Sequence, residues 1–120
     1  MPWQGDAKEF AAEWIAAWNA HDLERILSHY ASNVVLTSPV VIKVTGEASG
    51  TLRGKDALRS YFQKGLELFP NLEFTLIEAM QGLSSVVLCY RNQRGTQTGE
   101  FMEFDTEGKV SRVVANYSAA

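Results

Sequence analysis

Three large aromatic residues recur every four positions near the start of the chain, at Phe10, Trp14 and Trp18. Residues with this spacing lie on one face of a helix, so the pattern predicts a helix over residues 6–20 with a broad apolar face. Such a face must pack against a large apolar surface elsewhere in the molecule. The start of the chain therefore predicts one wall of a core or cavity.

Polar residues end this helix, and Asp22 is suited to cap a second, shorter helix that runs to about residue 30. Residues 33–38 follow, rich in β-branched side chains and stopped by Pro39, which predicts a strand. The next stretch, residues 40–51, begins with alternating apolar residues and contains Gly46 and Gly50. We interpret it as a strand or edge arm with a flexible turn.

A second long helix is predicted over residues 55–69, because Leu58, Phe62, Leu66 and Phe69 form a continuous apolar stripe that ends before Pro70. The apolar period then changes to two. Four strands are expected in consecutive antiparallel hairpins, at residues 72–80, 84–92, 98–105 and 109–117. Three helices packed on a curved, mostly antiparallel sheet make an α+β fold, shaped as a cone-like cup.

Composition limits the classes of partner. Acidic residues outnumber basic ones by 14 to 11, the formal net charge is −3, and the basic residues are scattered, which argues against nucleic acid. The first ten residues have neither the basic start nor the apolar stretch of a secretory signal, and no apolar run approaches the ~20 residues of a membrane span. We expect one domain over residues 1–120, cytoplasmic, with no membrane partner.

Motifs for cofactors and metals are absent from the sequence. It has no glycine-rich phosphate loop, no HExxH motif, no nucleophile elbow, and a single cysteine, Cys89. His21 and His29 are separated by the break between the first two helices, and we interpret His21 as a solvent-facing residue at a helix end and His29 as structural. We therefore expect neither a cofactor nor a metal site.

Three segments together resemble a known family: WNAHDLERILSHYASNVVLTSP at 18–39, LRGKDALRSYF at 52–62 and EFMEFDTEGKVSRVVANY at 100–117. In this order they are similar to the nuclear transport factor two-like superfamily, and most similar to its SnoaL-like branch, which is related to polyketide cyclases and ketosteroid isomerases. The resemblance covers essentially the whole chain and implies the cystatin-like roll of that superfamily. The superfamily includes enzymes and non-catalytic binding modules, so fold alone does not decide function.

The resemblance also points to three positions. Ketosteroid isomerases of this fold carry a proton-shuttling carboxylate before the proline that ends the first strand, and here that residue is Ser38, whose hydroxyl is a weak base. Their oxyanion-binding tyrosine in the first helix corresponds to Trp14. Their protonated carboxylic acid, which the field uses to illustrate pKa tuning, corresponds to Glu100. Since two of the three groups are replaced, isomerisation by that mechanism is not expected.

Strand alternation gives an independent argument for Glu100. If it faces inward, so do Met102 and Phe104, which would place one ionisable group in an apolar setting and raise its pKa. The alternative is that Glu100 lies at the exposed start of its strand. Tyr117 on the last strand is expected either to supply a phenol near the cavity mouth or, as we favour, to close the wide end of the cup.

The remaining candidates are apolar or peripheral. We expect the aromatic residues to form a core whose ring area suits the wall of a ligand chamber, namely Trp14, Trp18, Tyr30, Phe62 and Phe69. Arg91 and Arg94 are interpreted as a solvated hairpin end. Apolar residues on the outer sheet face are expected to meet a second copy in a homodimer, as is common in the superfamily, and the ones assigned there are Val86, Leu88, Phe101 and Val114.

Three functions remain open at this stage. The first is an enzyme that performs cofactor-free acid–base chemistry on a small hydrophobic, cyclic molecule, with Glu100 as the catalytic group. Its binding residues would be Trp14, Trp18, Tyr30, Ser38, Phe62, Met102 and Tyr117. The second is a module that binds an apolar ligand without turnover, and the third is an interaction domain whose dimer surface is its function.

Overall fold

The first two predicted helices are present in the computed structural model, which describes residues 2–119. Helix α1 (Ala7–Asn19) is capped by the Asp6 carboxylate, which accepts hydrogen bonds from the backbone N–H groups of Lys8 and Glu9. Helix α2 (Leu23–Leu27) is capped by Asp22. It ends earlier than predicted because strand β1 (Tyr30–Thr37) already begins at Tyr30.

The stretch after β1 is helical at its start, so the prediction of a strand or edge arm there is wrong. Helix α3 (Pro39–Thr45) begins with Pro39 at its first position, where the missing N–H group is tolerated. The Ser38 hydroxyl accepts a hydrogen bond of 3.1 Å from the Val40 N–H group, and Gly46 ends the helix in a left-handed conformation with φ of 78°. These end signals prevail over the strand propensity of the β-branched residues between them.

The remaining elements follow the predicted order. A short edge strand, β2 (Thr51–Arg53), precedes helix α4 (Lys55–Leu68), which is the predicted second long helix. The four predicted strands are present as β3 (Thr75–Gln81), β4 (Ser85–Arg91), β5 (Gln97–Phe104) and β6 (Val110–Tyr117). Residues 2–119 thus contain four helices and six strands, one helix more than the sequence predicted.

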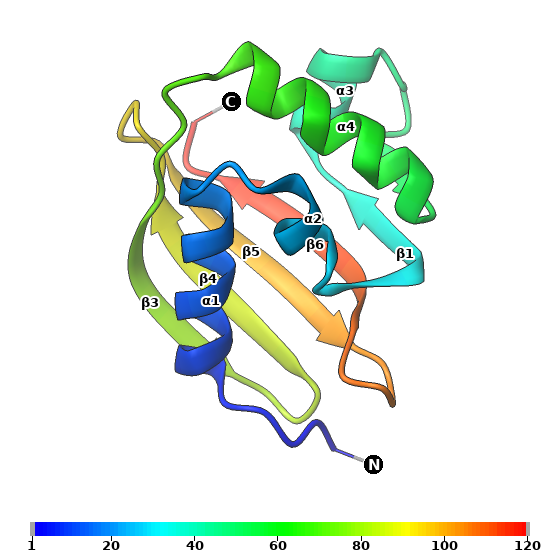
Figure 1. The fold of residues 1–120 in the computed structure, drawn as a ribbon, viewed down its shortest axis with the longest axis vertical. Helices are drawn as coiled ribbons and strands as arrows, with labels where there is room; N and C mark the ends of the chain where they lie inside the picture. Colours follow the sequence, from blue (N-terminus) through cyan, green and yellow to red (C-terminus); the bar gives the residue numbers. More distant parts are fainter. Residues whose placement is uncertain (1, 120) are drawn as a thin grey trace.

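The strands form one curved sheet in the order β2-β1-β6-β5-β4-β3. All neighbours are antiparallel except β1 and β6, which are parallel. The register shifts within β1–β6, β3–β4 and β5–β6, and such irregularities bend a sheet. Figure 1 shows α1, α2 and α4 on the same concave face, with α1 beside β3 and α4 above β1. The fold is therefore the expected α+β roll.

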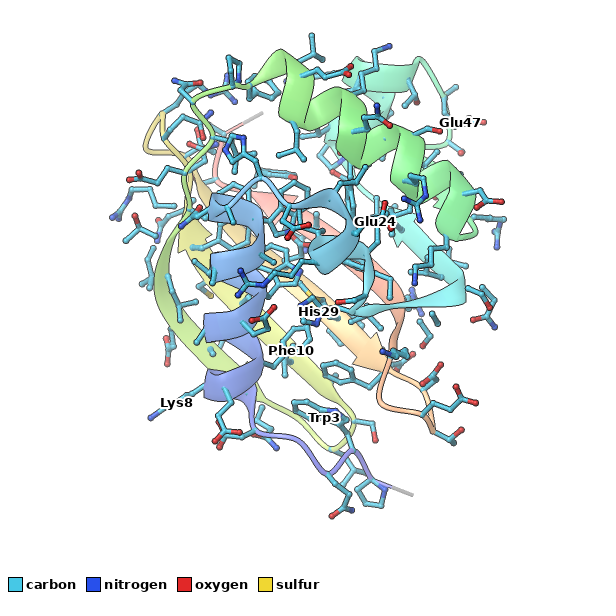
Figure 2. The ribbon with its side chains drawn as sticks, viewed as in Figure 1. Trp3, Lys8, Phe10, Glu24, His29 and Glu47 are labelled. Atoms are coloured by element: carbon cyan, nitrogen blue, oxygen red, sulfur yellow. The ribbon has the colours of Figure 1, made fainter. Side chains whose placement is uncertain are left out.

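Aromatic side chains close one end of the space between helices and sheet (Figure 2). The Trp3 ring stacks on Phe104 with 4.0 Å between centroids, and Phe10 meets Phe104 edge-on at 5.0 Å. His29 packs against the Phe10 ring, and its Nε2 atom lies 3.4 Å from the Glu13 carboxylate. With this end filled, a cavity has room only toward the opposite end, near α4.

In β4, the residues that face the concave side of the sheet are not the ones predicted to do so. Val86 and Leu88 are fully buried and pair with Met102 and Glu100, so they lie on the concave face and not on the outer one. Their run, VVLCY, is apolar at every position, so it contains no alternation from which the facing could be decided. The outer face instead presents a cross-strand row of half-buried residues, Val87, Phe101 and Val114.

Within residues 2–119, no helix has the length and apolarity that a membrane crossing requires.

Candidate functional site

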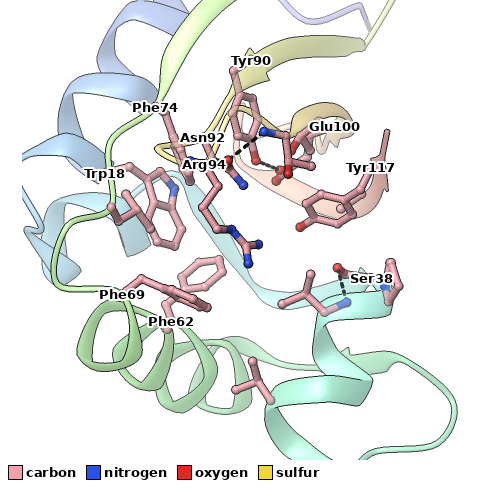
Figure 3. A pocket seen from close by; sticks show the side chains of 18 of the residues that line it. Trp18, Ser38, Phe62, Phe69, Phe74, Tyr90, Asn92, Arg94, Glu100 and Tyr117 are labelled. Carbon is pink, nitrogen blue, oxygen red and sulfur yellow. Dashed lines mark hydrogen bonds between the residues drawn. The ribbon is translucent and has the colours of Figure 1, made fainter. Parts of the chain in front are cut away.

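A cavity of about 250 Å³ opens between α4, α3, the end of α1 and the concave face of the sheet (Figure 3). This volume lies near the lower limit of roughly 300–1,000 Å³ for small-molecule sites. Aromatic rings make up much of its wall: Trp14, Trp18, Tyr61, Phe62, Phe69, Phe74, Tyr90 and Tyr117. The site therefore offers an apolar, ring-lined space for a small ligand.

Glu100 is the only carboxylate among the described residues that line the cavity. Its side chain is 6% exposed, and the Tyr90 hydroxyl donates a hydrogen bond of 2.5 Å to its Oε1 atom. Thr98, Met102 and Phe104 are buried on the same face of β5. The predicted inward orientation of Glu100 is thus confirmed, and the alternative of an exposed position at the strand start is wrong.

The surroundings of Glu100 place its titration near neutrality. Burial raises the pKa of this carboxyl from 4.5 to about 7, because the charged form loses its hydration. The hydrogen bond from Tyr90 opposes the shift but does not cancel it. Near pH 7 both the acid and the carboxylate are populated, so the group can either accept or donate a proton.

Three phenols and the Ser38 hydroxyl line the cavity together with this carboxyl. Burial raises the pKa of Tyr117 to about 12, and the negative charge of Glu100 adds to the shift. Burial also raises the pKa of Tyr61 and of Tyr90, again with a contribution from Glu100. All three phenols therefore remain protonated at neutral pH and can serve as hydrogen-bond donors. The Ser38 hydroxyl, 3% exposed, partly offsets the raised pKa of Tyr61 and of Tyr117.

Five of the predicted binding residues line the cavity: Trp14, Trp18, Ser38, Phe62 and Tyr117. Figure 3 shows the Tyr117 hydroxyl directed toward Ser38, so Tyr117 contributes to the cavity itself and does not only close the wide end. The indole N–H group of Trp14 is not available to a ligand, because it donates a 2.9 Å hydrogen bond to the Tyr30 hydroxyl.

Tyr30 and Met102 do not line the cavity, so their predicted place on its wall is corrected. Tyr30 is 1% exposed, and its hydroxyl is the acceptor for Trp14 in the core. Met102 is fully buried, two residues beyond Glu100 along β5 toward the end that Trp3 and Phe104 fill. Alternation gives the face of a strand on which a residue lies, but not its depth along a tapering cavity.

Sequence reasoning missed several residues of the cavity wall, and Tyr90 and Arg94 are the two that matter most for its chemistry. Tyr90 could have been found, because an inward-facing β4 opposite Glu100 places it diagonally across from that carboxyl. Arg94 is exposed, as expected for a solvated hairpin end, but it also lines the cavity mouth, with its guanidinium carbon 5.7 Å from the centre of the Phe69 ring. The direction of a hairpin-tip side chain depends on tertiary packing, which leaves no periodic signal in the sequence.

The two histidines are occupied in structural contacts. His21 Nε2 lies 2.9 Å from the Leu72 carbonyl oxygen, and burial lowers the pKa of His29. Among residues 2–119, no group of three or more His, Cys, Asp or Glu side chains is arranged to hold a metal ion.

Comparisons with known proteins agree with this fold. A SnoaL-like protein of unknown function from Burkholderia thailandensis E264 is 39% identical, with a TM-score of 0.93 over 99% of this chain and 100% of its own. A protein of unknown function with a cystatin-like fold from Methylobium petroleophilum PM1 is 15% identical, with a TM-score of 0.77 over 100% of this chain and 81% of its own.

An enzyme is also among the similar structures. SalBIII, described as epoxide hydrolase/cyclase-like with a role in pyran ring formation in the polyether salinomycin, is 17% identical. Its TM-score is 0.68 over 94% of this chain and 91% of its own, which shows a shared fold. No curated protein sequence matches the chain. The family model of the SnoaL-like domain matches residues 11–116, nearly the whole length. The chain therefore belongs to the SnoaL-like family.

Proposed function

We propose that this SnoaL-like protein is a cofactor-free enzyme that moves a proton within a small apolar, cyclic molecule, with Glu100 as the proton carrier. The observation that carries the proposal is a buried carboxyl, hydrogen-bonded to Tyr90 and titrating near pH 7, in the wall of an aromatic cavity. A cytoplasmic location, predicted from the sequence, remains part of the proposal.

The geometry suggests a role for each polar group. Ionised Glu100 accepts a proton from a carbon or hydroxyl of the ligand. The protonated Glu100 then donates this proton to a second atom of the ligand. Tyr117, protonated at neutral pH, donates a hydrogen bond to negative charge that develops on a ligand oxygen. Tyr90 holds the Glu100 carboxyl in one orientation through its 2.5 Å hydrogen bond.

A ring closure would need the same proton transfer. SalBIII has a role in pyran ring formation, and a hydroxyl that attacks to close a ring must lose its proton. In this chain Glu100 would accept that proton while the hydroxyl oxygen adds to one carbon of an electron-poor C=C bond, and it would then return the proton to the neighbouring carbon, which takes up the electron pair of the broken π bond. Isomerisation and cyclisation are thus two uses of one carboxyl, and the proposal covers both.

The test is solvent deuterium exchange at the acidic C–H positions of small cyclic ketones, followed by NMR at about pH 7. The wild-type protein is expected to accelerate exchange, and Glu100→Gln to reduce the acceleration at least about a hundredfold, as expected for loss of a general base. Gln keeps the size of the side chain and an oxygen that can accept from Tyr90. Equal rates for both proteins, with the fold intact, would remove Glu100 from the catalytic role.

A binding module without turnover is the second candidate, and one observation favours it. Ser38 stands where the isomerases of this fold have a carboxylate, and its hydroxyl already accepts from the Val40 N–H group as the cap of α3. Ligand binding in the cavity with no exchange above the Glu100→Gln level would support this second function.

We also propose that the outer sheet face forms a homodimer. The row of Val87, Phe101 and Val114 is only half-buried, and no helix of residues 2–119 covers this face (Figure 1). A Phe101→Glu variant is expected to sediment as a monomer where the wild type sediments as a dimer, because a charge on a paired apolar face is costly to bury. Glu107→Gln, at an exposed turn, is the control. A wild-type protein that is monomeric at high concentration would contradict the dimer.

A further inference from the structure

The charged residues around the cavity are distributed unevenly. Lys43 and Arg94 line it together with Glu100, so two of its three charged residues are basic. In the whole chain acidic residues are the majority, 14 against 11. Arg94 and Lys43 come from opposite sides, the β4–β5 hairpin and α3. The opening is therefore positively charged although the protein is not.

The backbone that carries Arg94 is well ordered by hydrogen bonds. The Asn92 side-chain oxygen accepts from the N–H groups of Arg94 at 2.9 Å and Thr96 at 3.0 Å. Gly95 takes the left-handed conformation with φ of 87° that this tight hairpin requires. The backbone of Arg94 therefore has a defined position at the tip of the β4–β5 hairpin.

The Arg94 side chain reaches from this hairpin toward the end of α4. Its guanidinium lies over the ring of Phe69, the residue that follows α4, and Figure 3 shows the group directed into the space between Trp18 and Ser38. A guanidinium held over a ring by a cation–π contact keeps its N–H groups free to donate hydrogen bonds. Those donors face the site that a ligand would enter.

Two of the six arginines have acidic partners, and Arg94 is not one of them. Arg25 pairs with Glu13 and Arg59 with Glu24. Within the described residues 2–119, no carboxylate forms an ion pair with Arg94. A guanidinium that extends from an ordered hairpin, lies over an aromatic ring and has no ion-pair partner at a cavity mouth can bind a planar anion with two parallel hydrogen bonds.

We propose that the ligand of this cavity is a small apolar molecule that carries a carboxylate, and that Arg94 binds this carboxylate at the mouth. The apolar body then lies among Trp18, Phe62 and Phe74, and the opposite end of the ligand meets Glu100. The inference deepens the proposed function by naming the substrate class, and it rests on that proposal only in placing the ligand in this cavity. It does not require turnover.

The test compares two nearly isosteric probes, 2-naphthoate and its neutral amide 2-naphthamide, by isothermal titration calorimetry. At about pH 6 most Glu100 is protonated and does not repel the anion, while the naphthoate is ionised. The wild type is expected to bind naphthoate about tenfold more tightly than naphthamide, as for one charge-assisted pair. In Arg94→Gln this preference is lost and naphthamide affinity is unchanged. Arg91→Gln, exposed and outside the cavity wall, keeps the preference.

Several outcomes would overturn the inference. Equal affinities in the wild type would show a ligand cavity without anion selection and would leave the proton-transfer proposal standing. A preference that persists in Arg94→Gln would assign the anion to another group, with Lys43→Gln as the variant to measure next. Failure of both probes to bind would overturn the carboxylate inference, and deuterium exchange would then decide the proposed function separately.

Discussion

Raising the pH from about 4 to about 8 is expected to lower the free energy of unfolding by about 3 kcal/mol through Glu100 alone. The reason is that the pKa of this carboxyl is about 7 in the folded protein and near 4.5 when it is exposed. Between these values the folded state holds a proton that the unfolded state has lost, so stability falls as pH rises. At about 1.4 kcal/mol per pKa unit, the shift gives the stated magnitude.

The measurement is urea unfolding across this pH range for the wild type and for Glu100→Gln. Gln does not titrate, so the wild-type curve minus the variant curve isolates the contribution of Glu100 from that of Glu13, whose pKa is lowered by Arg25. The difference should change most between about pH 4.5 and pH 7 and stay constant above that range. A difference that does not vary with pH would mean that Glu100 is not buried as described.

Replacing Trp14 by alanine is expected to lower the free energy of unfolding by about 3–5 kcal/mol. The indole is 1% exposed and packs against Trp18, Phe74 and Tyr90 with centroid distances of 6.0, 5.9 and 5.2 Å. Its removal leaves a cavity in the core and also takes away the hydrogen-bond donor of the buried Tyr30 hydroxyl.

Two variants make this result specific. Trp14→Phe keeps an aromatic ring and loses the N–H group, so its destabilisation should fall between those of the wild type and the alanine variant. Leu83→Ala removes a side chain that is 77% exposed and should change stability by no more than about 0.5 kcal/mol. If Trp14→Ala were as mild as Leu83→Ala in chemical unfolding, the predicted role of Trp14 in the core would be wrong.

Much of the fold could be predicted because several segments carry a clear period. The four-residue spacing of Phe10, Trp14 and Trp18 and the stripe of the second long helix gave α1 and α4, and turn residues divided β3 to β6. Helix α3 was missed because β-branched residues outweighed the Ser-Pro start and the glycine end in our interpretation. Val86 and Leu88 were assigned to the wrong face because their strand is apolar throughout.

The candidate site likewise has residues that the sequence predicted and residues that it did not. Glu100 followed from alternation in β5, where charged and apolar residues differ enough to show which ones face inward. Predicting that Tyr90 is the partner of Glu100 requires the register between β4 and β5, and the residue pattern of one strand does not reveal that register. Arg94 depends on how a hairpin tip meets the end of α4, a contact between segments about 25 residues apart that has no periodic signal.

Ser38 has two roles, as the cap of α3 and as a residue of the cavity wall, and a different side chain could keep the first role while changing the second. As the cap of α3 it must offer a side-chain oxygen to the Val40 N–H group, and aspartate meets this demand about as well as serine. The same side chain lies at a cavity that already holds Glu100, so an aspartate here would add a second carboxyl whose titration is coupled to the first. The single substitution Ser38→Asp would therefore convert a cavity with one acid into a cavity with an acid pair, while α3 keeps its cap. In this fold, the ionisable groups of the cavity can therefore change while the helices and strands stay the same.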